Sequence, residues 1–99
     1  MRYLAIINPA AGGGTCRKKA PALLGRLAEQ GIEVDTAETA AAGDATRIAR
    51  EAFAAGRRDF IVVGGDGTGF EVLNGFMPGA EESGEGVSMA FLPMGTGNS

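Results

Sequence analysis

The segment FIVVGGDGT at residues 60–68 decides the fold, because it joins a continuous apolar run directly to a glycine-rich turn. The run from Phe60 to Val63 is typical of a strand that is buried on both faces of a parallel sheet. After the turn, the apolar residues are spaced as on one face of a helix. They are Phe70, Leu73, Phe76 and Met77. A buried strand that leads into a helix through a tight turn indicates the α/β class.

The rest of the chain repeats this alternation of short apolar runs and amphipathic segments. Three further strands are expected, at residues 4–7, 32–36 and 87–92. Two further helices are expected, one from Cys16 that ends at Gly31 and one from Asp44, as its N-cap, that ends at Gly56. Residues 78–86 are expected to form an acidic loop. The order β-α-β-α-β-α-β predicts a mostly parallel, Rossmann-like sheet with helices on both faces.

Composition narrows the classes of function. A chain of 99 residues is one domain or part of one, and a net charge of −3 argues against a nucleic-acid binder. The chain has no histidine and one cysteine, which excludes Ser-His-Asp and Cys-His catalysis and a cysteine-cluster zinc site within it. No apolar run approaches the length of a membrane span, so we expect a cytoplasmic protein.

The sequence stops just after a glycine-rich segment at residues 93–98, where a further helix would begin. We therefore expect the α/β domain of residues 1–99 to be truncated, with more structure completing the fold. An uncovered face of the last strand would favour a homodimer.

Three of the expected strands end in loops suited to binding anions. These loops are residues 8–14, 64–68 and 93–98. Glycine amides and helix N-termini bind phosphates, and ligands of parallel sheets gather at the carboxyl ends of the strands. Neither GxxxxGK[ST] nor GxGxxG is present. Asp66 would repel phosphate oxygens unless Mg²⁺ lay between them, which favours a metal–nucleotide site with Asp66 as metal ligand and catalytic residue.

The motifs together resemble the catalytic domain of the diacylglycerol kinase-like family, which includes diacylglycerol, sphingosine and ceramide kinases. The resemblance spans the chain from Asn8 to Asn98. Its motifs are Asn8-Pro9 with Gly12, GGDGT at 64–68, Glu71, Asn74-Gly75, and PMGTGN at 93–98. The family pattern implies that ATP and Mg²⁺ bind to this domain. The contacts carried over are Asn8, Thr39, Gly65, Asp66, Gly67, Thr68, Glu71 and Thr96.

The resemblance also implies a lipid kinase that transfers phosphate to a lipid hydroxyl. A second, β-rich domain beyond Ser99 would bind the lipid and bring the protein into peripheral membrane contact, so residues 1–99 alone would be inactive. Two positions depart from the family pattern. Ser99 stands where the family often has Asp, and Gly69-Phe70 replaces an aliphatic-Asn pair.

Other interpretations of these motifs stay open. An NAD kinase has similar loops, and Gly12 to Gly14 followed by Asp35 loosely imitates a dinucleotide-binding fingerprint. A nucleotide-binding fragment without catalysis also fits. The basic cluster at residues 17–19 is typical of a solvated helix face, but it could also face phosphate or an anionic membrane.

Overall fold

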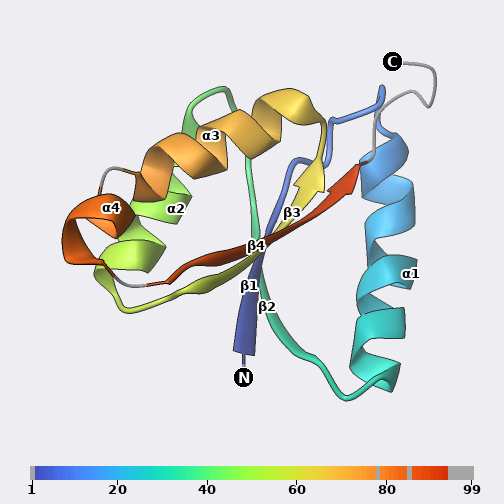
Figure 1. The fold of residues 1–99 in the computed structure, drawn as a ribbon. Helices are drawn as coiled ribbons and strands as arrows, with labels where there is room; N and C mark the ends of the chain where they lie inside the picture. The colour runs from blue at the N-terminus through green and yellow to red at the C-terminus, as the bar shows by residue number, and fades with distance from the viewer. Residues whose placement is uncertain (1, 78, 85, 94–99) are drawn as a thin grey trace.

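The computed structural model describes residues 2–77, 79–84 and 86–93, which form four strands and four helices. In chain order these are β1 (Arg2–Ile7), α1 (Thr15–Glu29), β2 (Glu33–Glu38), α2 (Asp44–Ala54), β3 (Asp59–Gly64), α3 (Asp66–Phe76), α4 (Gly79–Ser83) and β4 (Ser88–Pro93) (Figure 1). No helix of this described part is long and apolar enough to cross a membrane.

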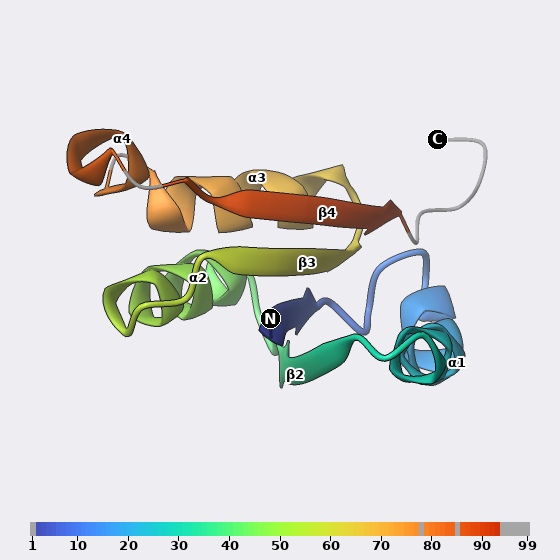
Figure 2. The same ribbon diagram turned by 60° about the horizontal axis from the view of Figure 1, so that its bottom comes forward.

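The four strands form one sheet in the order β2-β1-β3-β4, and every neighbouring pair is parallel. Helix α1 lies on one side of this sheet, and α2 and α3 lie together on the other (Figures 1 and 2). The predicted parallel sheet with helices on both faces is therefore confirmed.

Two apolar layers account for the continuous hydrophobic runs of β1 and β3. Alternate residues of a strand point to opposite faces, so a strand covered on both sides has no polar face. On the α2–α3 side the buried residues include Leu4, Ile6, Phe60 and Val62, and the Phe60 ring stacks on the Phe76 ring with centroids 5.3 Å apart. On the α1 side the buried residues are Ala5, Ile7, Cys16, Ala20, Ile61 and Val63.

The buried face of α3 matches the predicted face only in part, because Phe76 and Met77 pack on the core as expected but Phe70 and Leu73 do not. Phe70 and Leu73 are 68% and 38% exposed, whereas Val72 and Phe76 are buried. The reason is the close packing of α3 on α2, which is made by Gly75: a Cβ at that position would lie 2.5 Å from the Ala49 Cβ. The two helices therefore meet through small residues, and in this orientation of α3 the Phe70 and Leu73 side chains face outward, whereas Phe76 stays in the core.

Two further expectations on residues 40–86 were wrong. The N-cap of α2 is Gly43, with a φ of 90°, and not Asp44. The Asp44 carboxylate instead accepts hydrogen bonds from the amides of Ala40 (2.8 Å) and Ala41 (3.1 Å), so it shapes the preceding loop. Part of the expected acidic loop is the short helix α4, whose Ala80 packs on the core beneath α2 and α3.

Candidate nucleotide site

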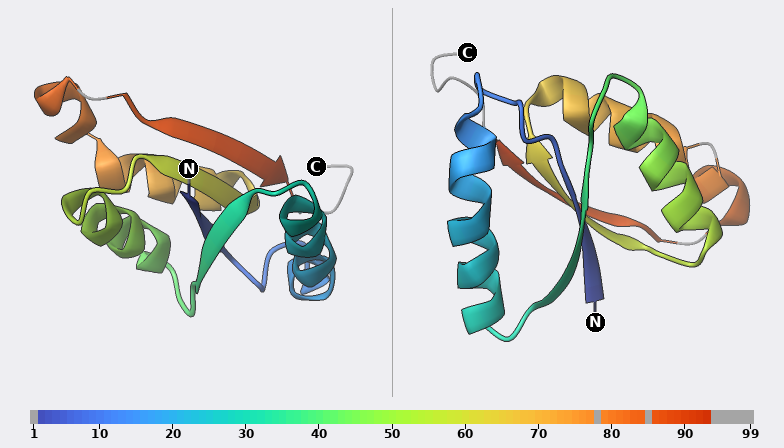
Figure 3. Two further views of the ribbon diagram at one scale, coloured as in Figure 1. Left: turned by 90° about the horizontal axis from the view of Figure 1, so that it is seen from below. Right: turned by 180° about the vertical axis from the view of Figure 1, so that it is seen from behind.

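A cleft of about 550 Å³ opens at the carboxyl ends of the strands, where β1 and β3 lie side by side. The chain leaves β1 toward α1 on one side of the sheet and leaves β3 toward α3 on the other. Ligands of open α/β sheets bind at such a switch point. The beginnings of α1 and α3 lie at this same end of the molecule (Figures 1 and 3).

Three segments line the cleft, and each comes from a different part of the chain. The loop after β1 supplies residues 8–12 and the start of α1 supplies Arg17. The loop after β2 and the first turn of α2 supply residues 39–42 and Ala45. The start of α3 supplies Gly65, Gly67, Thr68 and Glu71.

Asn8 joins the loop after β1 to α3. Its backbone amide donates to the Val63 carbonyl at 2.9 Å, and its side-chain Oδ1 accepts from the Ala10 amide at 3.2 Å. Its Nδ2 donates to the Thr68 Oγ1 at 3.2 Å, across 60 residues of sequence. Asn8 therefore fixes the two walls of the cleft relative to each other.

Gly64 has no side chain, and this leaves the space in which the hydrogen bond between Asn8 and Thr68 forms. A Cβ on Gly64 would lie 2.7 Å from the Thr68 Oγ1 and 3.3 Å from the Asn8 Cβ, which are both too close. The first glycine of GGDGT is thus required by packing, since its φ lies outside the left-handed region. The Thr68 side chain, which it admits, is only 6% exposed.

The backbone amides at the start of α1 are hydrogen-bonded to the loop that follows β1. The four amides of residues 14–17 donate to carbonyl groups of residues 9–12, at 3.1 to 3.3 Å. Gly12, Gly13 and Gly14 all have positive φ, which lets the chain fold back tightly enough for these bonds. These amides are therefore not directed at a ligand.

The start of α3 is different. Gly65 is its N-cap in an extended conformation, and no side chain caps the helix. The Gly65 carbonyl accepts from the Thr68 and Gly69 amides, but the amides of residues 65–67 have no hydrogen-bond partner within the described part of the chain. Free amides at the beginning of a helix are suited to bind phosphate.

The two acidic side chains near the beginning of α3 have different surroundings. Asp66 is exposed and is not among the residues that line the cleft. Glu71 lines the cleft, and its Oε1 accepts from the Gly43 amide at 3.1 Å. The Glu71 carbonyl accepts from the Thr46 hydroxyl at 2.8 Å, so this residue ties α3 to the start of α2.

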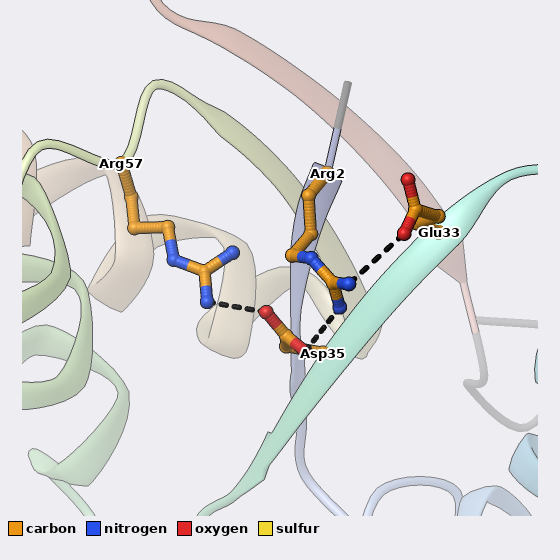
Figure 4. Close-up of polar contacts among 4 residues, drawn as sticks. All are labelled: Arg2, Glu33, Asp35 and Arg57. Carbon is orange, nitrogen blue, oxygen red and sulfur yellow. Dashed lines mark hydrogen bonds and ion pairs between the residues drawn. The ribbon is translucent and has the colours of Figure 1, made fainter.

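Charge fixes the loop that forms the second wall of the cleft. The amides of Ala40 and Ala41, with a smaller contribution from Arg47, hold the pKa of Asp44 below its usual value. Asp44 therefore stays ionised to a lower pH than an ordinary aspartate, and its hydrogen bonds to the two amides hold the loop in place. Another ion cluster, made by Arg2, Glu33, Asp35 and Arg57, lies where β1 and β2 begin, at the other end of the sheet (Figure 4).

The structure brings six of the eight predicted contact residues together around one cleft: Asn8, Thr39, Gly65, Gly67, Thr68 and Glu71. Asp66 lies beside the cleft at the first position of α3, and Thr96 falls outside the described residues. The sequence did not single out Arg17 from its basic neighbours, whereas the resemblance had indicated the stretch from Thr39 to Ala45, which contains four alanines that line the cleft. Within the described residues, no three His, Cys, Asp or Glu side chains form a metal-binding group.

Comparison with known proteins gives a consistent result. The family model described as "Diacylglycerol kinase catalytic domain" matches residues 2–99. Diacylglycerol kinase of Bacillus subtilis (strain 168) is 38% identical over 96 residues, which cover 94% of this chain and 29% of that protein. A Pseudomonas syringae pv. tomato protein named "Probable lipid kinase YegS-like" is 40% identical over 70 residues, which cover 71% of this chain and 22% of that protein.

A solved structure also matches. The crystal structure of a diacylglycerol kinase from Bacillus anthracis str. Sterne has a TM-score of 0.76 and 34% sequence identity, and the match covers 96% of this chain and 33% of that one. The chain thus spans about a third or less of the length of these relatives.

Proposed function

The chain belongs to the diacylglycerol kinase catalytic domain family, and from this membership we propose that residues 1–99 are the ATP-binding part of a lipid kinase. The whole enzyme would transfer the γ-phosphate of ATP to the hydroxyl group of a diacylglycerol-like or sphingosine-like lipid. The relatives are about three times as long as this chain. We therefore assign lipid binding and contact with the membrane surface to the remainder of the enzyme.

The observation that carries this proposal is the cleft at the switch point of the sheet, with free amides at one wall. The amides of residues 65–67 would donate to phosphate oxygens, and the partial positive charge at the beginning of α3 would add to this attraction. The Thr68 hydroxyl, positioned by Asn8, lies on the same wall. A chain with a net charge of −3 can bind a triphosphate in this way without a basic patch.

The opposite end of the cleft suits the nucleoside. Thr39, the alanines at positions 40–42 and Ala45 line it, and these small side chains leave room for a flat ring. The Thr39 amide donates to the Ile7 carbonyl at 2.8 Å, which continues the pairing of β1 with β2 and holds this wall against the sheet. We place the base and ribose here, with the phosphates directed toward α3.

Asp66 fits a magnesium ion that is bound together with the nucleotide. Mg²⁺ in phosphoryl-transfer sites is held by one or two carboxylates, by phosphate oxygens and by water. The Asp66 carboxylate could supply the protein ligand, and the phosphates bound by the neighbouring amides would supply the others. When bound, Mg²⁺ would neutralise charge on the phosphates. The residues of this chain would align the nucleotide, which is most of what phosphoryl transfer requires.

Nucleotide titration of the full-length enzyme tests this proposal. We expect ATP with Mg²⁺ to bind more tightly than NAD, and Asp66→Asn to weaken ATP binding about tenfold only when Mg²⁺ is present. Asp59→Asn is the matched control, because Asp59 begins β3 at the end far from the cleft, whereas Asp66 begins α3 beside the cleft. Tighter binding of NAD, or equal effects of the two variants, would refute the assignment.

The acceptor is tested separately, by measuring phosphate transfer from ATP to diacylglycerol or sphingosine in vesicles and to NAD in solution. We expect transfer to one of the lipids. Transfer to NAD alone would identify an NAD kinase instead.

A further inference from the structure

We infer that Arg17 binds the phosphate chain of the nucleotide from the wall opposite α3, an inference that rests on the ATP-binding function proposed above. Arg17 lies in the first turn of α1 and lines the cleft. Its Nη1 lies 3.9 Å from the position that a Cβ on Gly14 would take. The guanidinium therefore folds back toward the beginning of the helix, where the loop and the cleft are.

Within the described part of the chain, the Arg17 guanidinium has no acidic partner. The ion pairs there use Arg2, Arg47 and Arg57, each with one or two carboxylates. The first turn of α1 contains no acidic residue either. An unpaired guanidinium at the wall of a cleft can donate two parallel hydrogen bonds to a phosphate group.

The backbone around Arg17 explains why a side chain is needed on this wall. The amides of residues 14–17 already donate to carbonyl groups of the loop, so these four amides are not free to bind the ligand. Among the described residues that line the cleft, the other charged side chain is Glu71, whose negative charge would oppose a phosphate. Within this described lining, Arg17 is the cation that offsets this charge.

Two neighbouring cations provide the contrast. Lys18 and Lys19 follow Arg17 directly and are exposed, as Arg17 is, but they do not line the cleft. A diffuse attraction of the nucleotide to the basic turn would involve all three residues about equally. A direct contact would involve Arg17 alone, and its strength would grow with the number of phosphates on the ligand.

The experiment compares Arg17→Gln with Lys19→Gln in the full-length enzyme, because both changes remove one positive charge from the same turn. Binding of adenosine, AMP, ADP and ATP is measured by calorimetry with Mg²⁺ present. We expect Arg17→Gln to weaken ATP binding about tenfold and ADP binding less, and to leave adenosine within about twofold. Lys19→Gln should change ATP binding by less than about twofold. Arg17→Lys keeps the charge but not the paired donors, so its loss of ATP binding should lie between the losses of Arg17→Gln and Lys19→Gln.

Each outcome decides something. Equal losses for Arg17→Gln and Lys19→Gln, or equal losses for adenosine and ATP, would overturn the role of Arg17 and leave the ATP-binding function standing. If the unmodified enzyme does not bind ATP at all, the proposed function fails and this inference fails with it. An unchanged melting temperature of the unliganded Arg17→Gln variant would show that folding is not the cause of the loss.

Discussion

At the carboxyl end of β3, Gly64 leaves no room for a methyl group. In Gly64→Ala, the new Cβ would collide with Thr68 and crowd Asn8, which must separate to make space. We expect a loss of about 1–3 kcal/mol in the free energy of unfolding, measured in urea, together with weaker ATP binding.

Gly65→Ala is the matched control for this change. A Cβ on Gly65 would meet nothing within 4 Å, and its φ of −95° is open to any residue. Its unfolding free energy should stay within about 0.5 kcal/mol of the unmodified protein. A loss as large as that of Gly64→Ala would show that packing against Thr68 is not the reason for the first glycine.

Asp35 makes the stability of the chain depend on pH. The hydrogen bond from Arg57, with the charges of Arg57 and Arg2, holds the pKa of Asp35 below its usual value. A carboxyl whose pKa is lower in the folded state stabilises the fold above its unfolded pKa, which is about 3.9, and this contribution is lost as pH falls through the folded value.

We therefore expect Asp35→Asn to lower the melting temperature at pH 6 and to have a shrinking effect below about pH 4. Glu29→Gln changes an exposed residue where α1 ends, and it should leave the melting temperature close to that of the unmodified protein. Thermal unfolding between pH 2 and 7 measures both. A difference between Asp35→Asn and the unmodified protein that stays constant over this range would contradict the role of the ion cluster.

At this scale the sequence predicted the identity of most cleft residues but not their contacts. The motif around residues 64–68 named Gly65, Gly67 and Thr68, because the need for glycine at a phosphate-binding turn is local. The bond between Asn8 and Thr68 depends on pairing of β1 with β3, which no local pattern contains. Arg17 looked like its neighbours because only the fold shows which of three adjacent cations faces the cleft.

At the scale of elements, the contact between α2 and α3 depends on Gly75. An alanine in the middle of a helix is normally favoured over glycine by about 1 kcal/mol. Here the added Cβ would lie 2.6 Å from the Thr46 carbonyl oxygen and 3.0 Å from the Arg50 nitrogen, and backbone atoms cannot easily move. We expect Gly75→Ala to destabilise the protein by about 2 kcal/mol or more in urea unfolding.

The matched change on α1 should have the opposite sign. Gly25 is exposed in the middle of α1, and a Cβ there would meet nothing within 4 Å. Gly25→Ala should therefore stabilise the protein by about 0.5–1 kcal/mol. If both variants shifted stability in the same direction, helix propensity and not interhelical packing would govern Gly75.

The elements themselves were largely predictable, whereas their orientation was not. The strands and the three longer helices follow from apolar spacing, because this spacing is set by which faces are covered. The predicted rotation of α3 was wrong in part. Four large apolar residues suggested one buried face, whereas the structure packs Gly75 against Ala49, keeps Phe76 in the core and leaves Phe70 exposed. Sequence patterns weigh side chains by hydrophobicity and miss a contact that is made by the absence of a side chain.

At the scale of the whole molecule, the two edges of the sheet are unlike. The outer strand β2 carries Glu33, Asp35 and Glu38, which oppose pairing with another chain. The other outer strand, β4, has the sequence SMAFLP and carries no charge. An exposed apolar patch is formed by Met89 and Phe91 of this strand together with Gly69, Phe70 and Leu73 of α3.

We expect the chain of residues 1–99, prepared alone, to self-associate through β4 and this patch. Phe70→Glu should shift the sedimentation profile toward the monomer, because a charge would be buried in the contact. Ala22→Glu adds the same charge on the exposed side of α1 and should have no such effect. A chain that stays monomeric at every concentration would refute this expectation.

The position of Cys16 gives a way to follow the first turn of α1 in solution. Its thiol is fully buried against β3, with Sγ 3.7 Å from the Val63 carbonyl oxygen, and burial together with the Glu38 charge raises its pKa. Because the chain has one cysteine, the rate at which an aromatic disulfide reagent labels it reports how often this turn detaches from the sheet. A bound nucleotide that bridges both walls should slow the labelling, so the labelling rate of Cys16 would report nucleotide binding.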